Sequence, residues 1–86
     1  MNLKIIISQG KQTRLKESRY MRRLSYEKAA KFALGCMTKE ECLAIIGIPL
    51  ISEGISKISI LEVALEEYIP VNYNNQSEAI FRVQVL

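Results

Sequence analysis

The sequence predicts a small α+β domain with the element order β-α-α-β-β, in which a two- to three-stranded antiparallel sheet packs on an αα corner. Three observations support this class. Alternating apolar residues near both ends are typical of strands, and two segments between them have helical spacing. The chain has 86 residues, of which 49% are apolar. Residues 1–86 are therefore enough for one domain whose core needs no disulfide or metal.

The first element is a strand at Asn2–Ser8. Leu3, Ile5 and Ile7 fall on one face of it, and its β-branched content supports the assignment. The basic segment 11–23 follows, and its few apolar residues make no convincing stripe. We interpret this segment as a loop, or as a loop that runs into a ragged helical turn.

Two helices are then predicted. Ser25–Met37 carries apolar residues at helical spacing, with Ser25 as its cap. The second begins at Thr38, which forms a capping box with Glu41 and a hydrophobic staple through Met37 and Cys42. Gly47 and Pro49 predict its end, with Ile48 packed back on Leu43 in a Schellman motif.

Residues 57–69 are ambiguous between helix and strand. A helix would use Ser59 and Glu62 as a capping box. A strand would place Leu61, Val63, Leu65, Ile69, Val71 and Tyr73 on one face. Ala79–Leu86 alternates as a strand after a turn at Tyr73–Ser77. Because an isolated two-stranded sheet is marginal in water, we favour the strand, with Pro70 at an edge or a bulge.

Charge is distributed unevenly along the chain. Residues 1–23 hold seven basic residues and one acidic residue, so 7 − 1 gives +6, whereas residues 24–86 hold five and eight, so 5 − 8 gives −3. The candidate binding residues are Lys11, Arg14, Lys16, Arg19, Tyr20, Arg22 and Arg23. Arginine suits forked contacts to phosphate or carboxylate, and Tyr20 offers a stacking face. The alternative is a solvated loop, or one that folds back on Glu62, Glu66 and Glu67.

The segment TKEECLAIIGIP at residues 38–49 resembles the first helix and turn of a helix-turn-helix. The resemblance implies a recognition helix at Leu50–Ile58. That segment contains Gly54 and only one cation, Lys57, so it lacks the side chains that read bases. Helix packing alone explains the motif.

The composition argues against an enzyme. The chain contains no histidine, the usual general base near neutral pH. Cys36 and Cys42 have no histidine or aspartate to activate them, and their spacing matches no zinc site, so we expect two free, buried thiols. We expect no cofactor and no metal. The run Leu43–Ile51 is too short to span a membrane and no secretory signal is visible, so we expect a cytoplasmic protein.

The sequence therefore predicts a small non-enzymatic regulatory protein that docks on a polyanionic partner, with nucleic acid as the first hypothesis. The alternative is a protein-interaction module or small inhibitor that binds an acidic protein surface. Such a module could also bind its partner by strand addition, in which a partner strand pairs with an exposed edge at Asn2–Ser8 or Ala79–Leu86. The same edge would make a homodimer plausible.

Overall fold

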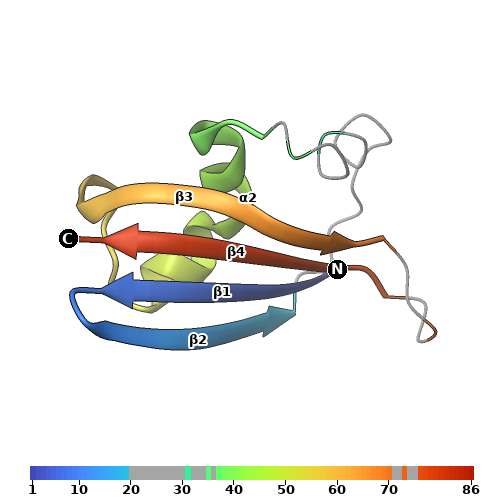
Figure 1. The fold of residues 1–86 in the computed structure, drawn as a ribbon, viewed down its shortest axis with the longest axis horizontal. Coiled ribbons are helices and arrows are strands. Elements are labelled where there is room, and N and C mark those ends of the chain that lie inside the picture. The colour runs from blue at the N-terminus through green and yellow to red at the C-terminus, as the bar shows by residue number, and fades with distance from the viewer. Residues whose placement is uncertain (20–30, 32–34, 36, 71–72, 74–75) are drawn as a thin grey trace.

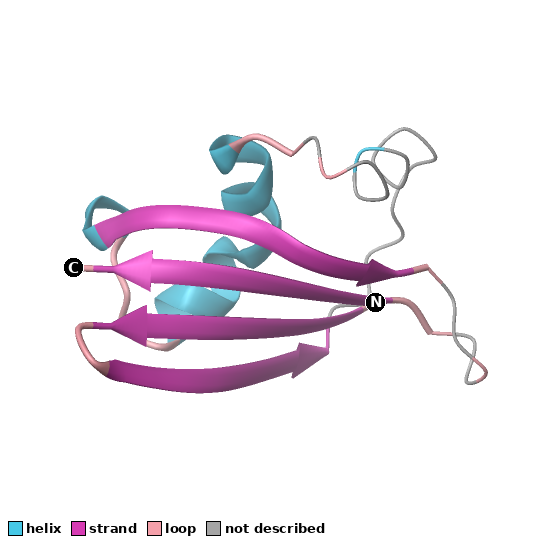
Figure 2. Ribbon diagram, viewed as in Figure 1, coloured by secondary structure: helices cyan, strands magenta, loops and turns pink. Residues whose placement is uncertain are grey.

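The computed structural model describes residues 1–19, 31, 35, 37–70, 73 and 76–86. In this part of the chain, a four-stranded mixed sheet carries helix α2 across one face (Figures 1 and 2). The elements are β1 (Asn2–Gln9), β2 (Gln12–Arg19), α2 (Lys39–Ser52), the 3₁₀ helix η1 (Lys57–Ser59), β3 (Ile60–Ile69) and β4 (Glu78–Val85). The α+β class is confirmed. The predicted order β-α-α-β-β is wrong, because two strands precede α2.

The sheet has the strand order β2-β1-β4-β3. Its two central strands run parallel, with Asn2 opposite Glu78 and Gln9 opposite Val85, and each pairs with an antiparallel neighbour on its other side (Figure 1). A wholly antiparallel sheet is therefore wrong. So are exposed edges at Asn2–Ser8 and Ala79–Leu86, because β1 and β4 carry the continuous apolar faces and burial of those faces places them at the centre.

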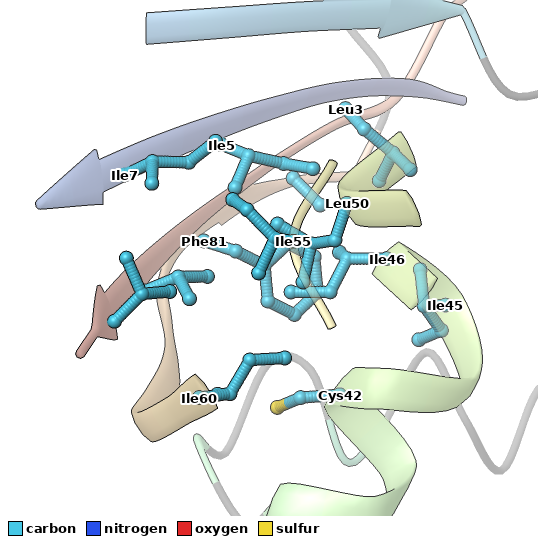
Figure 3. Close-up of a cluster of buried hydrophobic side chains, with 13 residues drawn as sticks. Leu3, Ile5, Ile7, Cys42, Ile45, Ile46, Leu50, Ile55, Ile60 and Phe81 are labelled. Carbon is cyan, nitrogen blue, oxygen red and sulfur yellow. The ribbon is translucent and has the colours of Figure 1, made fainter. Parts of the chain in front are cut away.

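The core lies between β1, β4 and α2. Leu3, Ile5 and Ile7 are buried on β1, as predicted. The buried residues of β4 are Ala79, Phe81, Val83 and Val85, which confirms the predicted strand there. Figure 3 shows Phe81 in one cluster with residues of α2 and with Ile55 from the segment that follows it.

The start of α2 is confirmed as a capping box. The Thr38 hydroxyl accepts a hydrogen bond from the Glu41 amide, and the Thr38 amide donates to the Glu41 carboxylate, both at 3.2 Å. Lys31 Nζ donates to the same carboxylate at 2.9 Å. The hydrogen bond from Lys31, followed by that from Thr38, lowers the pKa of Glu41 below its usual value. Met37 packs against the core cluster that includes Cys42, as the staple requires.

The predicted end of α2 is wrong. The helix continues to Ser52 with Pro49 inside it, and Glu53 caps it before Gly54, whose φ is +77°. A proline inside a helix loses a hydrogen bond. Here Pro49 and Leu50 are both buried, and that burial offsets the loss.

Two further predictions fail with the helix end. Ile48 is 77% exposed and does not pack back on Leu43. A recognition helix at Leu50–Ile58 is also wrong, because residues 50–52 complete α2 and residues 57–59 form η1. The local motif is therefore a capped core helix and not half of a helix-turn-helix.

The ambiguous segment 57–69 is a strand from Ile60 onward. Register shifts between Ile60 and Glu62, and between Leu65 and Glu67, change which side chains face the core. Leu61, predicted to be on the apolar face, is 57% exposed, while Ile60 is buried. Val63 and Leu65 pack on the core as expected. Pro70 follows β3, which is an edge strand.

Several predictions fall outside the described residues. The helix at Ser25–Met37, and with it the αα corner, lies mostly in residues 20–30, 32–34 and 36. The same holds for Cys36, for Val71 and for the centre of the turn at Tyr73–Ser77. Tyr73 itself lies in a turn and is 94% exposed, so it is not part of an apolar strand face.

Candidate functional site

Within the basic segment 11–23, Gln12–Arg19 form strand β2, so the prediction of a loop there is wrong. Gly10 and Lys11 form a two-residue turn between β1 and β2, and Gly10 has a φ of +58°. Such a positive φ is easy for glycine, and two-residue turns of this kind fit the twist of a hairpin. The turn brings β2 back along β1 in unbroken register over eight pairs, from Gln9↔Gln12 to Asn2↔Arg19.

The strand places its basic residues on two different faces. Arg14 and Lys16 lie opposite Ile7 and Ile5, so their side chains are on the face that α2 covers. Arg19 lies on the other face, and Lys11 is exposed in the turn. Tyr20, Arg22 and Arg23 lie outside the described residues. Among the described residues, the structure therefore brings together only Arg14 and Lys16 from the predicted site.

Arg14 and Lys16 share one carboxylate. Glu53 Oε1 lies 3.1 Å from Lys16 Nζ, and Glu53 Oε2 lies 3.8 Å from Arg14 Nη1. Glu53 caps the C-terminal end of α2, where the helix dipole disfavours an anion, and the last turn of α2 holds no basic residue. The two cations of β2 compensate that charge. Glu62, Glu66 and Glu67 are the internal partners predicted from the sequence, whereas the carboxylate that pairs with Arg14 and Lys16 is that of Glu53, which was not predicted.

The outer side of β2 is open along its length. In an antiparallel ladder, hydrogen-bonded pairs alternate with non-hydrogen-bonded pairs, and Gln9↔Gln12 closes the hairpin as a bonded pair. The backbone N–H and C=O groups that point away from β1 are thus those of Thr13, Leu15, Glu17 and Arg19. The Asn2 amide fits this alternation, because it donates to Ser77 O on the β4 side. No described strand pairs with this side of β2.

The opposite edge of the sheet is protected against strand addition. β3 contains two register irregularities, Pro70 follows it, and Lys39 Nζ donates to Ile60 O at 3.1 Å. Bulges and prolines are features that keep natural edges from pairing with other chains. β2 has neither of them. The regular, open edge of the described sheet is therefore β2.

The edge has a basic surplus on its own residues. β2 holds Arg14, Lys16 and Arg19 against Glu17, so 3 − 1 gives +2, and Lys11 precedes it. In the described part of the chain, no ion pair involves Lys11 or Arg19. Beside the end of β2, the open face has a shallow depression of about 390 Å³ lined by Glu17, Arg19, Lys4 and Glu78 among others. Lys4 and Glu78 lie 3.8 Å apart within it.

The described residues hold no cluster of His, Cys, Asp and Glu that could bind a metal ion. Cys42 is free and buried, as predicted for this thiol. Burial raises its pKa, and a hydrogen bond from the Leu65 backbone opposes that shift. A thiol in that state is a weak nucleophile. Among the helices of the described residues, none has the length and apolar character needed to cross a membrane.

No protein-family model, curated protein or solved structure matches this chain. A fold by itself does not specify a function. The inference of function must therefore come from the geometry and charge of β2. The hairpin was not predicted, and the sequence signal that could have identified it is the glycine of the two-residue turn Gly10-Lys11 directly after an apolar strand.

Proposed function

We propose that this protein is a small, non-enzymatic, cytoplasmic binding module that accepts an acidic segment of a partner protein as an additional strand along β2. The observation that carries the proposal is the combination of a regular open edge with a surplus of basic residues. Strand addition derives its affinity from backbone hydrogen bonds and its specificity from alternate side chains. On β2, the outward N–H and C=O groups of four residues would supply the affinity, and the cations would supply the specificity.

The alternation of charge on β2 defines which segment would fit. A partner strand beside β2 would have acidic side chains on both faces, because Arg14 and Lys16 lie on one face and Arg19 on the other. On the helix-covered face, the partner's carboxylates would compete with Glu53 for Arg14 and Lys16. On the open face, Arg19 has no such competitor among the described residues.

Nucleic acid is the second candidate. Lys11 and Arg19 are exposed and carry no ion pair in the described part of the chain, and Arg22 and Arg23 follow in the sequence. Such cations can neutralise phosphates. The edge of β2 favours the protein partner, because a row of alternating donors and acceptors matches a peptide backbone and not a chain of phosphates.

The test uses a fluorescent peptide with the order Glu-Glu-Val-Val-Glu-Glu-Val-Val, the Glu-Val peptide, which has the eight-residue length of β2 and places Glu on both faces of the strand. Fluorescence anisotropy would measure its binding beside a Lys-Val peptide and a Glu-Val peptide that is N-methylated at every residue, so that neither edge of the strand keeps its donors. N-methylation removes donors but keeps the charge, so it separates strand pairing from simple attraction. We expect binding of the unmodified Glu-Val peptide alone.

Matched variants locate the site. Leu15→Pro removes an outward-facing N–H of β2, whereas Leu15→Thr keeps it, and backbone NMR spectra would verify that both variants remain folded. We expect the proline variant to lose binding and the threonine variant to retain it. Equal binding of the methylated peptide, or an unchanged affinity in a folded Leu15→Pro variant, would show that strand addition is wrong.

Single-stranded DNA, single-stranded RNA and duplex DNA would be titrated in the same assay. Nucleic-acid binding predicts a steep, linear fall of log affinity with log salt concentration and a loss of affinity in Lys11→Gln/Arg19→Gln. If these probes bind and the Glu-Val peptide does not, the second candidate replaces the first.

A further inference from the structure

Helix α2 is apolar on two opposite sides. Its inward stripe consists of Cys42, Ile45, Ile46, Pro49 and Leu50, all buried. A second stripe, which we call the outward stripe, consists of Ala44, Gly47, Ile48 and Ile51. These positions follow the i, i+3, i+4, i+7 spacing of one helix face. Ile48 is 77% exposed and Ile51 is 71% exposed. A surface helix normally has polar residues on this side, so the outward stripe requires an explanation.

The outward stripe borders an apolar groove. The groove has a volume of about 320 Å³ and runs between α2 and the segment that leads into β3. Ala44, Gly47 and Ile51 line it on the helix side, and Ile55 and Ile60 line it on the other. A Cβ atom placed on Gly47 would meet no atom within 4 Å. The small residues therefore leave space in which another helix could approach α2 closely.

Two charges of opposite sign stand at the rim of the groove. Glu40 lies in the first turn of α2 and Lys57 lies in η1, and both line the groove. Both side chains are exposed, and neither forms an ion pair with another described residue. One acid and one base on the same apolar patch make it complementary to itself, which is the condition for a two-fold interface between identical chains.

We propose that the outward stripe is a homodimer interface in which the α2 helices of two copies pack antiparallel across a two-fold axis. In this arrangement Glu40 of each copy faces Lys57 of the other. The apolar stripe supplies the buried centre of the interface, and the two symmetric ion pairs fix its register.

A dimer formed through β2 is disfavoured by the same reasoning. Antiparallel pairing of β2 with β2 about its centre would set Arg14 and Lys16 of one copy opposite or diagonal to the same two residues of the other. Like charges opposite one another destabilise a sheet. A second copy is therefore accommodated at α2, and the β2 edge stays available to a different partner.

Sedimentation velocity over a concentration series from about 1 µM to about 1 mM would test the proposal across the range of weak association. We expect a monomer–dimer equilibrium that Ile51→Glu shifts to monomer. Leu15→Glu is the matched control, because it adds the same charge at another exposed apolar residue, 57% exposed, on the opposite side of the sheet. A wild-type chain that remains monomeric at the highest concentration overturns the proposal.

Charge reversal tests the register of the two copies. Glu40→Lys and Lys57→Glu should each weaken the dimer, because each single change places two like charges together. The double variant Glu40→Lys/Lys57→Glu should restore it, since both ion pairs form again with their signs exchanged. If Ile51→Glu leaves the dimer dissociation constant unchanged, the two chains meet at another surface. The same conclusion follows if the double variant dimerises no more strongly than the single variants. These outcomes do not depend on the peptide experiments with β2.

Discussion

The ammonium group of Lys16 lies 3.1 Å from the carboxylate of Glu53, and this pair joins the edge strand β2 to the end of α2. Arg14 contacts the second oxygen of the same carboxylate at 3.8 Å. The pair connects residues 37 positions apart in the sequence. The positive charges of Lys16 and Arg14 on β2 therefore compensate the anion Glu53 at the C-terminal end of α2.

Glu53→Gln separates stability from binding. The ion pairs are partly exposed, and such pairs contribute about 0.2–1 kcal/mol each at most. The change also removes an anion that the helix dipole disfavours. We therefore expect urea unfolding to change by less than about 1 kcal/mol, while the Glu-Val peptide binds more tightly because Arg14 and Lys16 lose their internal competitor. Unchanged peptide affinity would show that these two cations take no part in binding.

Removing the N-cap hydroxyl should weaken the whole fold. Thr38→Ala leaves the Glu41 amide without its acceptor, and loss of such a cap destabilises a protein by about 1 kcal/mol. Thr38→Ser is the control, because serine keeps the hydroxyl. Urea denaturation monitored by circular dichroism would measure both variants. The capping role is contradicted if alanine and serine give equal stability.

The capping box also predicts a pH dependence. The pKa of Glu41 is lowered in the fold, so its stabilisation is present above the ordinary value of 4.5 and is lost as pH falls through the lower folded value. Glu41→Gln keeps a side-chain oxygen but cannot titrate. The stability difference between wild type and this variant should therefore be largest at neutral pH and should shrink towards pH 3. A constant difference would contradict the assigned shift, and a difference that is larger in acid would reverse its sign.

Pro49→Ala tests why α2 continues past a proline. Alanine restores a backbone N–H and a better helix residue, worth about 3 kcal/mol relative to proline. It also removes about two buried CH₂ groups, at about 0.8 kcal/mol each, and the rigidity that proline gives the unfolded chain, about 0.4–1 kcal/mol. We expect a net gain between zero and about 1 kcal/mol. Clear destabilisation would mean that the proline ring packs better than this balance allows.

The parts of the fold that sequence reasoning predicted correctly are those whose signal is local. The alternation in β1 and β4 identifies their buried faces, and Thr38 and Glu41 define the helix start within four residues. The parallel pairing of β1 with β4 has no local signal, because it joins residues about 76 positions apart.

The missed elements have equally physical reasons. β2 was missed because it has no apolar face. As an edge strand, it places Arg14 and Lys16 beside the end of α2 and not in the core. Pro49 alone predicts a helix end, but burial of Pro49 and Leu50 offsets its cost, and α2 continues to Ser52. Of the seven candidate site residues, the sequence could name the basic types, but it could not show that strand alternation places Arg14 and Lys16 on one face and Arg19 on the other.

The parallel centre of the sheet has a consequence for how the protein folds. Each hairpin, β1-β2 and β3-β4, is local, but the two halves of the sheet join only where Asn2–Gln9 meets Glu78–Val85. Pairing of β1 with β4 closes a loop that contains most of the chain. The chain loses conformational entropy in this step before burial of the core residues can compensate the loss. We therefore expect a slow, cooperative folding transition in milliseconds to seconds. During synthesis, the apolar face of β1 would remain without its central neighbour until residues near Val85 have left the ribosome.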